Sequence, residues 1–142
     1  MVIRKRSRLL APWIALLALA GCDDGLMPVS GTVTIDGQPL AHGQIRMVIE
    51  GGRTAIGNLQ PDGSFTLTSL DFGDGVPPGT HLVTISAVEG VNERSQRWHA
   101  PKRYASKTAS QLWVTIEDPT KALSLELTWE GSGHNKPFVE RF

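Results

Sequence analysis

Residues 29–40 read VSGTVTIDGQPL, and this stretch decides the fold class of the chain. Valine, glycine and isoleucine alternate with serine and threonine over residues 29–35, so one face of an extended strand is apolar and the other is polar. Asp36-Gly37 follows directly, and this pair favours a tight hairpin turn because both residues tolerate a positive φ. The stretch therefore predicts a strand that runs into a hairpin.

The same alternation recurs along the chain, with glycine, proline and aspartate at the turns between segments. The further strands that we expect cover residues 44–50, 54–59, 64–68, 80–88, 111–117 and 121–129. Seven short strands in about 100 residues predict an all-β fold, a seven-stranded antiparallel β-sandwich, because one sheet alone would leave an apolar face in water. The chain has a single cysteine, so this fold must be stable without an internal disulfide.

Two segments lack the alternation. Residues 89–110 form a long connection without regular spacing, and connections of this length are commonly functional or mobile. Residues 131–142 form a polar, glycine-containing tail that we expect to fray, although Phe138 could add a short edge strand.

Three motifs together resemble a known family. GTVTIDGQPL (31–40), PDGSF (61–65) and PGTHLVTI (78–85) occur in the order and spacing of the carboxypeptidase regulatory-like domain, a transthyretin-like or prealbumin-like β-sandwich. The match is closest to small lipoproteins of planctomycete-type bacteria that carry one such domain. This resemblance implies a transthyretin-like sandwich over residues 29–130. It also implies no catalytic residues, because in zinc carboxypeptidases the domain looks like an accessory to folding or interaction.

The first 21 residues have the charge and length of a secretory signal peptide. Four basic residues lie within the first eight positions, and the apolar run of residues 9–20 is too short to cross a bilayer as a helix. The run ends in Leu19-Ala20-Gly21-Cys22, which looks like a bacterial lipobox with cleavage before the cysteine. The alternative is an ordinary signal peptide followed by a chance cysteine.

Lipidation of Cys22 would anchor the mature protein without a transmembrane helix, because two or more acyl chains bind a membrane stably. We therefore expect a lipid-anchored protein of the cell envelope, with residues 22–28 as anchor and short linker. The whole chain has 14 basic and 14 acidic residues, but the mature chain keeps 10 basic residues and a net charge of −4. A mildly acidic domain is a poor nucleic-acid binder, so no nucleic-acid partner is expected.

Enzyme motifs are missing from the sequence. It has no G-x-S-x-G, no H-E-x-x-H, no Walker loop and no dinucleotide fingerprint. None of the four histidines precedes a glutamate by three positions or fewer, and they are dispersed, so a metal site could assemble only through folding: His42, His81, His99 and His134. We expect no catalytic residue, metal or cofactor, although a hydrolase whose residues converge across loops stays an alternative.

Two further candidates have ordinary structural explanations. His81 lies on the apolar face of its strand, where a histidine is more often a core residue than a ligand. Asp71 and Asp74 could offer oxygens to a hard cation, but the segment lacks the remaining acids of a calcium loop. We expect these acids to form a turn.

The aromatic residues give the best functional lead. Alternation places Trp113 opposite to its apolar neighbours, so it either stacks on a partner or is covered by the protein itself. We expect residues 89–110, which contain Trp98 and Tyr104, to fold over it. The alternative is a platform on which Trp98 and Trp113 stack sugar rings. The same segment is locally basic, which fits either a solvated loop or a contact with an anionic glycan or partner.

The sequence thus favours a membrane-anchored, non-enzymatic β-sandwich lipoprotein that acts as an interaction or envelope-structural module. A carbohydrate-binding module that uses exposed aromatics is the alternative. The candidate contact surface consists of Trp98, Tyr104 and Trp113.

Overall fold

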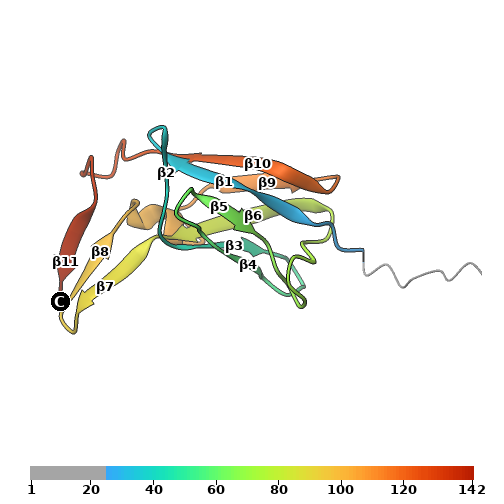
Figure 1. Cartoon of the computed structure of the whole chain (residues 1–142), viewed down its shortest axis with the longest axis horizontal. Helices are drawn as coiled ribbons and strands as arrows, with labels where there is room; N and C mark the ends of the chain where they lie inside the picture. Colours follow the sequence, from blue (N-terminus) through green and yellow to red (C-terminus); the bar gives the residue numbers. More distant parts are fainter. Residues whose placement is uncertain (1–24) are drawn as a thin grey trace, which may run out of the picture.

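Strand pairing dominates the computed structural model, which describes residues 25–142 and is all-β, as the alternation predicts (Figure 1). These residues form eleven strands and a 3₁₀ helix, η1 (Lys102–Ala105). In chain order the strands are β1 (Val29–Ile35), β2 (Gln38–Pro39), β3 (Gln44–Val48), β4 (Ala55–Asn58), β5 (Ser64–Thr66), β6 (Gly79–Ser86), β7 (Val88–Asn92), β8 (Ser95–Trp98), β9 (Leu112–Ile116), β10 (Thr120–Leu127) and β11 (Phe138–Arg141).

The first sheet is built on β1, which pairs with β10, β2 and β5. β2 and β5 run antiparallel to β1, whereas β10 runs parallel to it. Gly31 lies where the register of the parallel pair shifts, and a Cβ there would lie 1.8 Å from the carbonyl oxygen of Leu123. Only glycine therefore allows the two strands to approach this closely.

The second sheet has the strand order β4-β3-β6-β9, and all its pairs are antiparallel. Ile45 and Met47 of β3 and Val83 and Ile85 of β6 point inward and have no exposed surface, as their alternation predicts. His81 is buried on the same face, and its Nε2 lies 2.8 Å from the carbonyl oxygen of Pro77. It is the satisfied core histidine that the sequence predicts.

These two sheets lie one above the other in Figure 1, and their inner faces share one hydrophobic core. Val33 and Leu125 from the first sheet meet residues such as Val83 and Val114 from the second. Full burial of each such aliphatic side chain contributes about 1.5–3 kcal/mol to the hydrophobic term of folding. The arrangement is consistent with a β-sandwich.

A third sheet, in the order β11-β8-β7, lies at one end of the molecule, opposite to the start of β1 (Figure 1). It corrects the prediction of a long connection over residues 89–110, which contain strands and a 3₁₀ helix. The tail does not fray but forms β11, an edge strand that begins at Phe138, as the sequence analysis allowed. β7 and β8 pair as an antiparallel hairpin, and β11 adds to β8. Every residue of β7 is exposed, so this strand lacks the apolar alternation that reveals a strand in sequence.

The strand count and the strand directions also differ from the prediction. All seven predicted strands are present, and β2, β7, β8 and β11 are additional. The prediction of a purely antiparallel sandwich is wrong, since β1 and β10 are parallel. Alternation reports which face of a strand is buried but carries no information about the direction of its neighbour.

Candidate functional site

The predicted lipidation site and its cleavage residues lie outside the described residues, which begin at residue 25. This applies to Leu19, Ala20, Gly21 and Cys22. Within residues 25–142, no helix combines the length and the apolar character needed to cross a bilayer.

Trp113 points away from the core on β9, and 64% of its surface is exposed. The prediction that residues 89–110 cover it is therefore wrong. The physical reason is that these residues pair among themselves and with β11 in the third sheet. Among the described residues, no ring stacks on Trp113.

Trp113 belongs to a row of apolar side chains on the outer face of the second sheet. Leu82 lies directly opposite Trp113, and Val48 lies opposite Leu82 on the other side. Directly opposed residues of antiparallel strands point to the same face, so the three side chains form one line across the sheet. We call Val48, Leu82 and Trp113 the outer apolar row. Beside it, the hydroxyls of Thr80 and Thr115 lie 2.8 Å apart.

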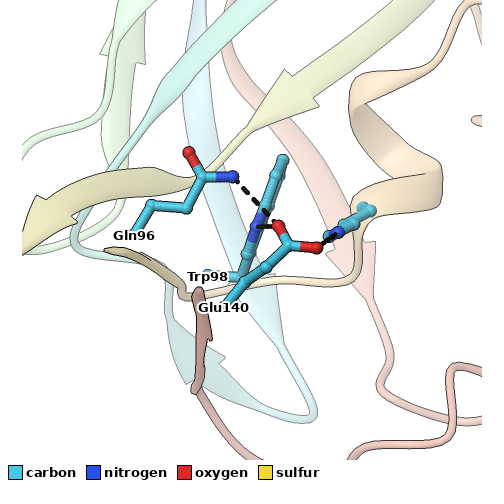
Figure 2. Close-up of polar contacts among 4 residues, drawn as sticks. Gln96, Trp98 and Glu140 are labelled. Carbon is cyan, nitrogen blue, oxygen red and sulfur yellow. Dashed lines mark hydrogen bonds and ion pairs between the residues drawn. The ribbon is translucent and has the colours of Figure 1, made fainter. Parts of the chain in front are cut away.

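Trp98 is half-buried and belongs to a polar cluster around Glu140 of β11. Figure 2 shows Gln96 and Trp98 directed at the Glu140 carboxylate. The indole N–H donates to Glu140 Oε2 at 3.1 Å, and Gln96 Nε2 donates to the same oxygen at 3.0 Å. Lys102 forms an ion pair with the other oxygen and lies over the Trp98 ring. These contacts join β8, β11 and η1.

The hydrogen bond from Lys102, with those from Gln96 and Trp98, lowers the pKa of Glu140 to about 2. The carboxylate is therefore charged throughout the physiological range. The donors come from β8 and η1, so the cluster connects β11 to these two elements. We call Gln96, Trp98, Lys102 and Glu140 the Glu140 clasp.

Tyr104 lies in η1 and is buried, with only 6% of its surface exposed. Its hydroxyl accepts hydrogen bonds from the backbone N–H of Thr128 at 3.1 Å and from Arg103 at 3.0 Å. Arg103 also donates to the Thr128 carbonyl at 2.9 Å. Tyr104 thus fixes η1 to the end of β10. Of the three predicted contact residues, only Trp113 offers an open ring.

The acidic segment before β6 forms a turn, as expected. The Asp74 carboxylate accepts hydrogen bonds from the backbone N–H groups of Ser69, Leu70 and Asp71 at 2.7–3.0 Å. Burial raises the pKa of Asp74, but the backbone hydrogen bonds together outweigh this effect and lower it. The oxygens are occupied by the loop's own N–H groups.

Folding brings together three side chains that the sequence analysis did not connect: His42, Glu89 and His99. His99 Nε2 lies 2.9 Å from Glu89 Oε2, and the rings of His42 and His99 stack with centroids 4.4 Å apart. The hydrogen bond with His99 lowers the pKa of Glu89. A hairpin recognised over residues 88–98 would have placed Glu89 beside Arg97 and so close to His99.

No family model, curated protein or solved structure matches the chain. Any function must therefore follow from the residues themselves. Among the described residues, the outer apolar row and the histidine cluster are the two features that the fold alone does not require.

Proposed function

We propose that this protein is a lipid-anchored, non-enzymatic module of the cell envelope that binds a partner protein through the outer face of β9. The observation that carries the proposal is the outer apolar row, in which Trp113 of β9 is 64% exposed. A large aromatic side chain of this kind contributes strongly when a partner covers it, because it buries much apolar area at a small entropic cost.

The N-terminal sequence supports the anchor. Cleavage at the lipobox would leave lipidated Cys22, with strand β1 beginning at Val29. The backbone of Met27 pairs with that of Val76, so Cys22 lies only five positions before a residue that is bound to the folded chain. The third sheet lies opposite to the start of β1 (Figure 1), and anchoring would hold it away from the bilayer.

The motif order supports a carboxypeptidase regulatory-like domain of transthyretin type, and the sandwich-like pair of sheets fits it. In this interpretation the third sheet, formed by β7, β8 and β11, is an addition to the sandwich. Such a domain has no catalytic residues of its own, which agrees with the lack of enzyme motifs in the sequence.

A carbohydrate-binding function is the second candidate, and the paired hydroxyls of Thr80 and Thr115 beside Trp113 favour it. A ring with flanking hydroxyls can stack on a sugar and hydrogen-bond to it. Trp98 would contribute little, because Glu140 holds its N–H and Lys102 lies over its ring. A sugar site would therefore depend on Trp113 alone.

The test compares the anchored protein with Trp113→Ala and Phe72→Ala, the second being a matched control because Phe72 is 90% exposed in a loop. Each form is chemically crosslinked in native envelopes and also applied to a cell-wall glycan array. We expect a discrete protein adduct that Trp113→Ala loses and Phe72→Ala retains. Glycan binding that depends on Trp113 would favour the second candidate, and adducts indifferent to Trp113 would contradict both.

A further inference from the structure

The cluster of His42, Glu89 and His99 offers a second site, distinct from the outer apolar row. Two imidazoles and one carboxylate each present a ligand atom, and these atoms all lie within 4.8 Å of one another. His42 and Glu89 are exposed, and His99 is partly exposed. The cluster is therefore open to ions from solvent.

Main-chain contacts place all three residues close to one buried residue, Ala87, which is 1% exposed. The N–H of His99 donates to the Ala87 carbonyl at 2.7 Å. Gly43, next to His42, packs so tightly that a Cβ would lie 2.8 Å from Ala87 Cα. Glu89 lies in β7, two residues after Ala87 in the chain. The three ligands are thus held together by main-chain contacts that do not depend on an ion.

We propose that His42, Glu89 and His99 bind a divalent transition-metal ion of borderline softness, such as Zn²⁺. Two imidazoles with one carboxylate form a donor set that zinc uses when one coordination position stays open. Bond lengths of about 2.0–2.1 Å place the ligand atoms of a tetrahedral zinc about 3.3 Å apart. Glu89 and His99 already lie closer than this, and rotation of the exposed His42 side chain would complete the set.

The open position would face a groove at the rim of the sandwich. His42 and His99 line this groove together with Pro39, Leu40 and Trp129, and its volume is about 330 Å³. Water or a small anionic group on a partner could occupy the fourth position there. The ion would also join the loop before β3 to the third sheet, which stabilises the folded state because the unfolded chain lacks the site.

The test is a zinc titration by isothermal calorimetry on the full chain in detergent micelles, without a polyhistidine tag and with Cys22→Ser to remove the only thiol. We expect one zinc ion per chain. His99→Ala and Glu89→Gln should each weaken binding at least about 10-fold, since loss of even an outer-shell partner weakens it about 10–100-fold. His134→Ala is the matched control, because His134 stacks on Phe138 outside the cluster and should leave binding unchanged.

A second measurement distinguishes a loss of zinc binding from a loss of folding in the variants. The unfolding temperature should rise with zinc in the parent chain and stay constant in His42→Ala, whose side chain is exposed. Cobalt(II) should give the intense visible bands of a four- or five-coordinate ion in the parent only. Absence of saturable zinc binding, or an equal loss in His134→Ala, would overturn the proposal.

Discussion

Replacing Gly31 by alanine tests the close parallel approach of β1 and β10, the least expected feature of the fold. The added Cβ would lie 1.8 Å from the carbonyl oxygen of Leu123 and 2.6 Å from its carbonyl carbon. Ordinary contact needs more than 3 Å, and both neighbours are backbone atoms, so the strands must separate by more than 1 Å. This movement breaks ladder hydrogen bonds between β1 and β10.

Each broken bond leaves a donor or acceptor unsatisfied at about 1–3 kcal/mol, so loss of one or two bonds lowers the free energy of unfolding by about 1–6 kcal/mol. Gly90→Ala is the matched control, because no atom lies within 4 Å of its added Cβ, and we expect a change below about 0.5 kcal/mol. Urea unfolding of the mature domain with Cys22→Ser measures both. A Gly31→Ala protein as stable as the parent would refute the parallel pairing.

Three further predictions concern the clasp, η1 and the anchor. The pKa of Glu140 is lowered to about 2, so its stabilising contribution is complete above about pH 4.5 and is lost as the pH falls towards 2. The indole N–H resonance of Trp98 should follow this loss, whereas that of Trp113 should not, and a constant Trp98 signal would contradict the clasp. Tyr104→Phe should lower the free energy of unfolding by about 0.5–1.5 kcal/mol, because it removes the part-buried hydrogen bond from the N–H of Thr128, and thermal or urea unfolding checks this. Mass spectrometry of the mature N-terminus should find lipidated Cys22, and an unmodified cysteine or another cleavage point would exclude the anchor.

The elements with one buried face could be predicted from the sequence. The alternation in β1, β3, β6 and β9 assigned the inner side chains correctly, and it also placed Trp113 outside the core. These predictions succeed because apolar and polar residues separate by face wherever a sheet covers a core.

Most of the third sheet could not be predicted, because the hairpin that starts it includes β7, which does not have this separation. β7 is exposed throughout, and β11 is stabilised by the Glu140 clasp, whose members come from β8, β11 and η1. The histidine cluster escaped prediction for a related reason. Its ligands come from three segments that main-chain contacts at Ala87 bring together, and no spacing in the sequence records such contacts.

The most direct test of the proposed function is photo-crosslinking in living cells with a photoreactive phenylalanine analogue at position 113, against the same analogue at position 72. If the outer apolar row is the contact surface, one discrete adduct should form from position 113 and none from position 72. The absence of an adduct at position 113, or the same adducts from both positions, would contradict the account.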